Sequence, residues 1–178
     1  MEPSDEELMR RFRDGEDAAF DALYARHSGA VFGFLQRLVR DEATAEDLVQ
    51  VTFTSLVRSR DRFLDSMKLT PWLFTIAANA ARGVHRQRAV RTRAHETQQL
   101  GAEVSAAPPE FDPGLRREVD AAMNKLPPAQ REAVVLHKVQ GLSFEEVAQV
   151  LGVSPTAARI KAHRGYEKLR ELLANLKD

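Results

Sequence analysis

The sequence predicts an all-α fold made of two small helical domains joined by a flexible linker. Apolar residues recur at helical spacing along most of the chain, and strand signals such as period-2 alternation or Asn-Gly and Asp-Gly turns are nearly absent. The helical pattern breaks between Thr92 and Pro113, where Gly101 and Pro108-Pro109 occur among few large apolar residues. We therefore expect domains at 1–91 and 114–178, with a linker at 92–113.

Each expected helix follows from this spacing and from residues that begin or end helices. The predicted ranges are 4–13, 17–39, 44–60, 71–91, 114–125, 128–139, 143–151 and 155–175. Both domains are short, so we expect small cores.

Composition narrows the class of protein. Hydrophobic residues make up 43% of the 178 residues and charged residues 29%, as in globular proteins. No apolar run approaches the ~20 residues that span a bilayer, and Met1–Glu7 is acidic without the apolar segment of a secretory signal. The absence of cysteine excludes disulfides, thiolate zinc sites and a cysteine nucleophile. We expect a cytoplasmic protein without membrane insertion.

The formal net charge is zero, but the charges are unevenly distributed. Residues 1–50 carry 6 basic and 12 acidic side chains, residues 51–100 carry 9 and 3, and residues 101–178 carry 11 of each. Because a polyanion responds to local potential, the middle segment is the candidate nucleic-acid region. The acidic first segment is better suited to a protein partner.

The C-terminal domain contains a predicted helix-turn-helix. Ser143 and Glu146 form a capping box for a short helix that ends at Gly152. Ser154 then caps a second helix with Pro155 at its first position. Two helices joined by a tight glycine turn are typical of this DNA-binding motif.

The second helix has two distinct faces. Its inward face carries small and apolar residues, namely Ala158, Ala162, Gly165, Leu169 and Leu172. Its outward face carries Thr156, Arg159, Ile160 and His163, flanked by Arg164. This pattern favours a recognition helix in the major groove, with Arg159 able to bind guanine and Arg164, Lys161 and Lys168 able to bind phosphates. The alternative is a helical hairpin with a solvated basic face, and the outward Glu167 departs from a uniformly basic surface.

The helix that opens at Pro71-Trp72 carries a second candidate DNA face. Thr75, Asn79, Arg82 and Arg86 lie on one side, opposite an apolar face of Leu73, Ile76, Ala77, Ala80 and Val84. Five arginines occur between 82 and 93 with no acid among them. Such a face can bind base edges and phosphates, although a solvated polar face remains an alternative.

The segment from Phe63 to Thr70 precedes this helix and is predicted to be a loop. Phe63 lies at one end and Trp72, the single tryptophan, at the other. Aromatic rings beside a basic helix can stack on unpaired bases. The alternative is that both rings fill the small core.

The segment Thr44–Phe53 is predicted to be helical, with Leu48, Phe53 and Leu56 toward the core. Asp47, Gln50, Thr54 and Arg58 form a polar stripe on another face. Spacing alone does not distinguish an interface from a solvent-facing stripe.

No catalytic constellation is present. The five histidines are scattered, and the chain has no HExxH, P-loop, GxGxxG after a strand, or GxSxG motif. We therefore predict no enzyme activity, no metal and no cofactor, with His137 a structural residue.

The order of these parts resembles an extracytoplasmic-function (ECF) sigma factor of the sigma-70 family, from about Phe20 to Leu173. The resemblance is carried by Ala45–Gln50 with Thr52-Phe53, Trp72–Asn79, Leu126–Glu132 and Gly141–Ala148. It implies region 2 and region 4 domains joined by a linker, and the function of an alternative sigma factor that directs promoter-specific initiation by core RNA polymerase.

The resemblance also implies roles for individual residues. Asp47, Gln50 and Thr54 would contact the β′ clamp helices of the polymerase, with the β flap as a further polymerase contact. The unpaired non-template strand at −10 would be bound by Phe63, Leu69, Trp72, Thr75, Asn79, Arg82 and Arg86. The −35 duplex would be bound by Ser154, Pro155, Thr156, Arg159, Ile160, His163 and Arg164. An anti-sigma factor is a further expected partner.

The sequence departs from the family pattern at several positions. Val51 stands where the family usually has Glu, and Gly165-Tyr166-Glu167 replaces the more usual Ala-Arg-Lys. In the same helix Ala157-Ala158, Ile160 and Ala162 replace Thr-Val, Ser and Leu.

Two other classes of function remain open at this point. One is a helix-turn-helix regulator with an N-terminal sensing or dimerisation domain, which would bind duplex DNA without polymerase. The other is a protein-interaction adaptor such as a decoy, for which Arg159 and Asn79 would be dispensable.

Overall fold

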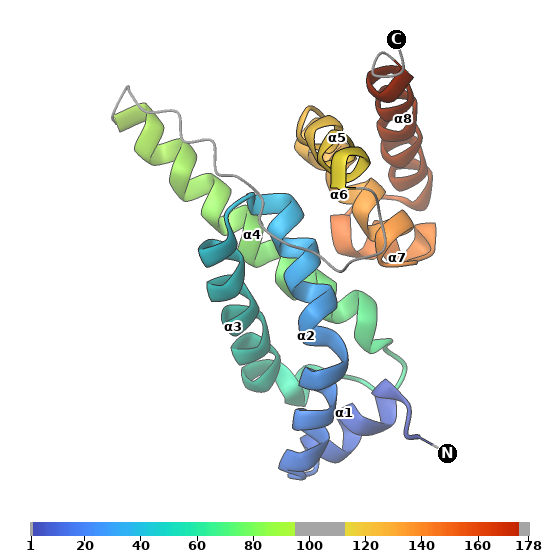
Figure 1. The fold of residues 1–178 in the computed structure, drawn as a ribbon. Helices are drawn as coiled ribbons and strands as arrows, with labels where there is room; N and C mark the ends of the chain where they lie inside the picture. The colour runs from blue at the N-terminus through green and yellow to red at the C-terminus, as the bar shows by residue number, and fades with distance from the viewer. Residues whose placement is uncertain (1, 95–112, 175–178) are drawn as a thin grey trace. The chain divides into compact units, whose positions relative to one another are not determined.

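The computed structural model describes residues 2–94 and 113–174, which belong to two compact units within residues 1–104 and 105–178. All regular elements of the described residues are helical (Figure 1), which confirms the predicted all-α class. Helix α4 continues to Ala94, beyond the expected boundary at 91. Most of the predicted linker, 95–112, lies outside the described residues.

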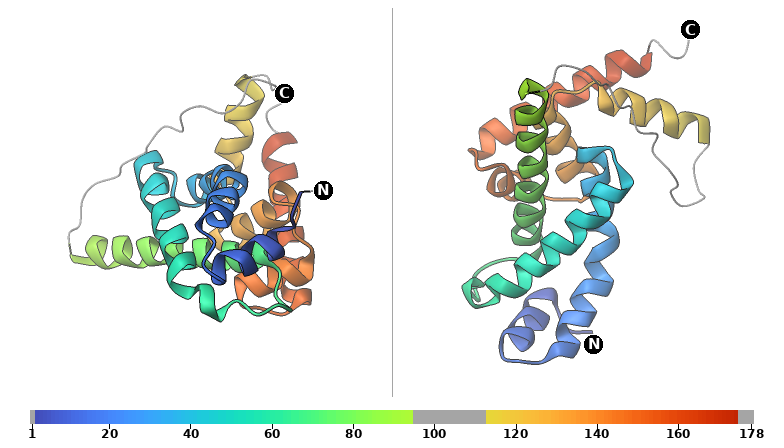
Figure 2. Two further views of the ribbon diagram at one scale, coloured as in Figure 1. Left: turned by 90° about the horizontal axis from the view of Figure 1, so that it is seen from below. Right: turned by 90° about the vertical axis from the view of Figure 1, so that its left-hand side faces the viewer.

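The first unit contains helices α1 (Asp5–Arg13), α2 (Asp17–Val39), α3 (Glu42–Ser59) and α4 (Leu69–Ala94), with a 3-10 turn η1 (Arg60–Arg62) after α3. Helices α2, α3 and α4 pack on one another, and α1 packs on α2. The core is built from fully buried side chains that come from all four helices, among them Met9, Leu35, Leu56 and Phe74. Figure 2 shows α1 at the same end of the unit as η1 and the start of α4.

Local caps set the helix boundaries in this unit. Ser4 Oγ accepts a hydrogen bond from the Glu7 N–H at 3.1 Å, and Asp41 accepts one from the Thr44 N–H at 2.8 Å. Between α2 and α3 the chain turns at Arg40, a non-glycine residue with φ of 56°. These caps satisfy backbone groups that a helix end leaves without a partner.

The second unit contains α5 (Pro113–Asn124), α6 (Pro128–Val134), α7 (Phe144–Leu151) and α8 (Pro155–Ala174). Between α6 and α7, residues Val135–Val139 form a π-helical turn, η2, in which the Gln140 N–H binds the Val135 carbonyl at 3.0 Å. The expected helix at 128–139 is therefore continuous in position but changes its hydrogen-bonding pattern after Val134.

Buried Arg131 joins α5 to α6. Its guanidinium donates to the carbonyl oxygens of Met123, Asn124 and Leu126 at 2.9 to 3.0 Å. The cation thus satisfies carbonyls at the C-terminal end of α5, where the helix dipole favours positive charge.

Among the described residues, no helix combines the length and the apolar character needed to cross a membrane.

Candidate nucleic-acid and polymerase interfaces

The predicted helix-turn-helix is present as α7, a turn and α8. Ser143 and Glu146 form a complete capping box, with hydrogen bonds of 3.2 and 2.9 Å. Gly152 adopts the left-handed conformation with φ of 66°, and Ser154 Oγ accepts the Ala157 N–H at 3.2 Å. The local sequence therefore fixes the turn that orients α8.

The predicted inward and outward faces of α8 are both present between Ser154 and Gly165. Ala158, Ala162 and Gly165 are buried, whereas the outward candidates Ser154, Pro155, Thr156, Arg159, Ile160, His163 and Arg164 are all exposed. These seven side chains share the exposed surface of α8 and the turn before it. Several of them, with Phe144 and Tyr166, line a hollow along the helix.

Two outward side chains of α8 are oriented by neighbours. The Arg159 guanidinium lies 5.2 Å from the centre of the Phe144 ring, and that ring stacks on His137 at 4.1 Å. His137 Nδ1 in turn lies 2.7 Å from the Leu142 carbonyl oxygen, so the expected structural role of His137 agrees with its contacts. His163 Nε2 lies 3.3 Å from Glu167 Oε1.

Tyr166 stands behind this face and was not among the predicted site residues. Its hydroxyl oxygen is buried without a hydrogen-bond partner, and burial raises the pKa of the phenol. The ring lies under the Lys138 ammonium, 5.8 Å away. Tyr166 therefore supports the outward face as an uncharged aromatic, where the family usually has a charged Arg.

In the first unit, the polar face of α4 has the predicted composition. Asn79 and Arg86 are exposed, Thr75 and Arg82 are half-buried, and Asn79 Oδ1 accepts a hydrogen bond from Arg82 Nη1 at 3.0 Å. Thr75 Oγ1 donates to the Pro71 carbonyl at 2.8 Å. The Asn79 amide nitrogen and the Arg86 guanidinium thus remain at the surface for a ligand.

Two residues of the predicted loop that were expected to bind DNA, Phe63 and Leu69, are buried. Phe63 and Leu69 are each only 1% exposed, and Phe63 packs on the half-buried Trp72 with ring centres 5.3 Å apart. Phe63 therefore belongs to the core, as the alternative interpretation of the sequence proposed. The exposed side chains of the loop are instead Leu64, Asp65, Ser66 and Lys68.

The predicted polymerase face lies on α3. Asp47, Gln50, Thr54 and Arg58 are all exposed, while Leu48, Phe53 and Leu56 are buried as expected. Two apolar residues beside this stripe were not among the predicted polymerase contacts: Val51 is 48% exposed and Tyr24 of α2 is 43% exposed. A hollow between α2 and α3 is lined by Tyr24, Ser28, Gly29, Phe32, Glu46, Val49 and Gln50.

The remaining basic residues of α4 differ in role. Arg88 donates to the Val39 carbonyl at 3.3 Å and to Thr44 Oγ1 at 3.2 Å, so it ties α4 to the start of α3. Arg91 and Arg93 belong to the part of α4 whose side chains are not described.

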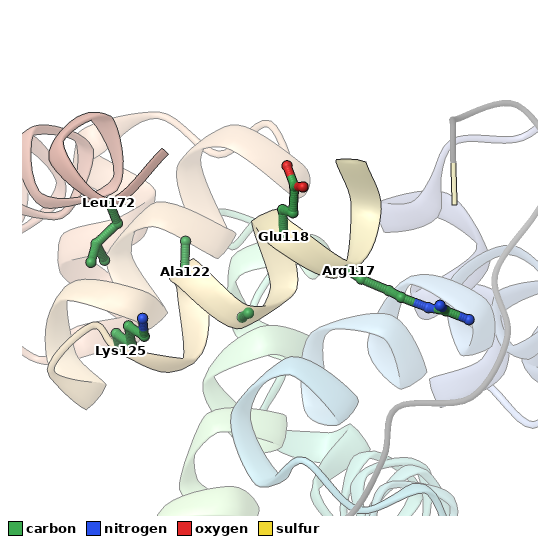
Figure 3. A pocket seen from close by; sticks show the side chains of 6 residues that line it. Arg117, Glu118, Ala122, Lys125 and Leu172 are labelled. Carbon is green, nitrogen blue, oxygen red and sulfur yellow. The ribbon is translucent and has the colours of Figure 1, made fainter. Parts of the chain in front are cut away.

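A further hollow lies between α5 and α8. Figure 3 shows Leu172 of α8 facing Ala122 and Lys125 of α5, with Glu118 and Arg117 further along α5. None of these residues was predicted to bind a ligand. Within the described residues there is no cluster of three His, Asp or Glu side chains that could hold a metal ion.

Both units match known protein families. Residues 23–91 match the family described as Sigma-70 region 2, and residues 116–169 match the family described as Sigma-70, region 4. The RNA polymerase sigma factor CarQ of Myxococcus xanthus is 54% identical over 169 residues, which are 94% of this chain and 97% of CarQ. The ECF RNA polymerase sigma factor SigE of Mycolicibacterium smegmatis is 34% identical, over 98% of this chain and 71% of SigE.

Solved structures agree with these relatives. The sigma factor RpoE from Bartonella quintana, in complex with the anti-sigma factor NepR, has a TM-score of 0.79 and 27% identity over 87% of this chain and 96% of RpoE. CnrH in complex with the cytosolic domain of CnrY has a TM-score of 0.74 and 30% identity over 96% of this chain and 97% of CnrH. The chain therefore belongs to the sigma-70 family of RNA polymerase sigma factors, in its extracytoplasmic-function class.

Proposed function

We propose that this protein is an alternative sigma factor that binds core RNA polymerase and directs initiation at promoters with specific −10 and −35 elements. The observation that carries the proposal is the presence, in one chain, of a capped helix-turn-helix and of an Asn–Arg face beside an exposed loop. A duplex-binding motif alone fits many regulators, whereas the second feature suits unpaired bases. The protein would act in the cytoplasm, where core polymerase is found, and would not be an enzyme itself.

At −35, α8 would enter the major groove. Arg159 is the candidate for guanine contact, and the guanidinium of Arg164 suits a phosphate. The buried Ala158, Ala162 and Gly165 let α8 lie close to its neighbours, so that the exposed face projects from a rigid base.

At −10, α4 and the preceding loop would bind the non-template strand. Asn79 can bond a base edge while Arg82 and Arg86 neutralise the backbone. Since Phe63 and Leu69 are buried, we assign base contact in the loop to its exposed part, Leu64 to Lys68, and treat Phe63 and Leu69 as anchors of that loop. Half-buried Trp72 retains some surface for stacking.

At the polymerase, the exposed stripe of Asp47, Gln50 and Thr54 would bind the β′ clamp helices. Val51 and Tyr24 add apolar surface next to this stripe, which is the composition expected at a protein interface. The second unit would meet the β flap.

Transcription with purified components tests the proposal. The full chain is mixed with core RNA polymerase and candidate promoter fragments, and run-off products are mapped. We expect a start-site-specific transcript that requires the chain, together with capture of core polymerase in the absence of DNA. Absence of both would refute the proposal; duplex binding without polymerase capture would favour a simple regulator.

We further propose control by an anti-sigma factor. RpoE and CnrH, which resemble this chain, were each solved with a bound partner, and NepR is described as an anti-sigma factor. A candidate anti-sigma factor, for which neighbouring genes are the first source, should reduce the transcript in proportion to its molar ratio when it is added to the run-off reaction. A transcript unchanged by an excess of that protein would remove it as the regulator.

A further inference from the structure

Helix α1 holds both ends of the loop that precedes α4. Arg13 Nη1 donates to the Phe63 carbonyl at 3.0 Å and lies 3.3 Å from Asp65 Oδ1. About two turns earlier on α1, Glu6 Oε1 accepts the Leu69 N–H at 3.2 Å. Two side chains of one helix therefore fix the loop where it leaves η1 and where it enters α4.

Helix α1 is itself held firmly. Its apolar face, Leu8, Met9 and Phe12, is at most 3% exposed. Asp5 binds Arg26 at 3.0 Å and His27 at 2.8 Å, which joins the start of α1 to α2. Both anchors of the loop thus project from a helix with little freedom to move.

Between its anchors the loop exposes most of its side chains to solvent. Leu64, Asp65, Ser66 and Lys68 are exposed, with Leu64 at 56%. One backbone hydrogen bond, from the Met67 N–H to the Leu64 carbonyl at 2.9 Å, closes a turn inside it. The contacts from Arg13 and Glu6 therefore hold the two ends of the backbone from which these exposed side chains project.

We infer that α1 sets base preference at the −10 element, with Arg13 and Glu6 as positioning residues that act through the loop. The inference rests on the proposed function, in which residues 64–68 contact unpaired bases. Loss of either anchor allows the loop several positions, so that correct and incorrect bases are bound with more similar affinity. Discrimination falls because specificity is a difference of affinities.

The test uses the full chain with core polymerase and a promoter library in which the −10 and −35 segments are randomised. Sequencing of the transcripts gives the preference for each base at each position. The variants are Arg13→Gln and Glu6→Ala. Glu6→Gln, which keeps an acceptor oxygen, and Arg13→Lys, which keeps a charged donor, are the conservative partners. Arg10→Gln and Glu7→Ala, at exposed positions of the same helix, are the matched controls.

We expect Arg13→Gln and Glu6→Ala to reduce base preference at one or two −10 positions roughly five- to ten-fold, as for one lost charge-assisted hydrogen bond. Preference at −35 and capture of core polymerase stay unchanged. Glu6→Gln and Arg13→Lys keep most of the −10 preference, and both controls match the wild type.

Two results would overturn the inference. Equal loss of transcription from all promoters, together with a lower unfolding temperature, would make the contacts structural only. Unchanged −10 preference in both Arg13→Gln and Glu6→Ala would show that the loop is held without them. Failure of the proposed function is recognised separately, because the wild-type chain would then give no promoter-dependent transcript.

Discussion

Phe144 illustrates how a single residue connects fold and function. It is the first residue of α7, and its ring lies between His137, stacked at 4.1 Å, and the Arg159 guanidinium at 5.2 Å. The face of an aromatic ring attracts a cation, which restricts where the guanidinium can go. Phe144 is thus placed to orient Arg159 before DNA binds.

Replacing the ring should weaken −35 recognition. Phe144→Leu keeps apolar bulk and removes the ring face, a change worth ~0.5–1 kcal/mol, so activity at a strong −35 element should fall roughly two- to five-fold. Phe144→Tyr, which keeps the ring face, should retain activity. In an Arg159→Ala background Phe144→Leu should have no further effect in run-off transcription; an undiminished effect there would mean that the ring acts by another route.

The carboxyl group of Asp41 predicts that the stability of the first unit depends on pH. Hydrogen bonds from the Thr44 hydroxyl and the Thr44 N–H, with Arg88 nearby, lower the pKa of this carboxyl. A lowered folded-state pKa means stabilisation that is complete above the unfolded value of about 3.9 and is lost as pH falls through the folded value.

Asp41→Asn should keep the cap but remove this pH dependence, because asparagine caps helices about as well and does not titrate. The difference in stability between wild type and variant should be complete above about pH 4 and should shrink as pH falls below that value. Urea unfolding followed by the fluorescence of Trp72, the single tryptophan, measures the first unit. A gap that is constant across acid pH would contradict the assignment.

Among the helix contacts, the close packing of α6 on α8 depends on the absence of a side chain at Gly165. A Cβ at Gly165 would lie 2.6 Å from Val134 Cγ2 and 3.3 Å from the Gln130 carbonyl oxygen. Val134 is buried and β-branched, so it has little room to move. The two helices therefore approach as closely as glycine permits.

Gly165→Ala should destabilise the second unit by about 1–2 kcal/mol, because overpacking outweighs the better helix propensity of alanine. The matched control is Gly29→Ala in α2, where a Cβ meets nothing within 4 Å and stability should rise by ~0.5–1 kcal/mol. Unfolding by far-UV circular dichroism, with Trp72 fluorescence reporting the first unit, separates the effects. Stabilisation by Gly165→Ala would show that α8 shifts at little cost.

The helix ranges show how much of the fold could be predicted from the sequence alone. The expected ranges 17–39 and 155–175 agree closely with α2 (Asp17–Val39) and α8 (Pro155–Ala174), since caps and periodicity are local signals. The π-turn after Val134 was not predicted, because residues 128–139 have the same apolar pattern in either helix type. Local patterns also did not decide whether Phe63 is core or surface.

Contacts between residues far apart in the sequence also could not be predicted. Arg13 and Phe63 are 50 residues apart, and nothing in either stretch indicates the hydrogen bond between them. The same holds for Arg88 and Val39, at a separation of 49 residues. The candidate surfaces could be listed from helical faces, but the residues that support them required the packed structure.

At the scale of the whole molecule, two units with separate cores carry two candidate DNA surfaces. Because the two surfaces belong to different units, we expect the free-energy costs of substitutions in them to add. Promoter activity would then fall by the product of the two single effects when both surfaces are changed.

Asn79→Ala and Arg159→Ala test this independence. We expect a loss of roughly five-fold for Asn79→Ala from a lost hydrogen bond, and a loss of about ten-fold or more for Arg159→Ala from a lost base contact. The double variant should show the product of the two losses in run-off transcription. Gln87→Ala on α4 and Arg170→Ala on α8, both at exposed positions, serve as controls and should leave activity unchanged. If the double variant is as active as the less active of the two single variants, the two surfaces act in one coupled step. The losses from independent contacts would instead multiply.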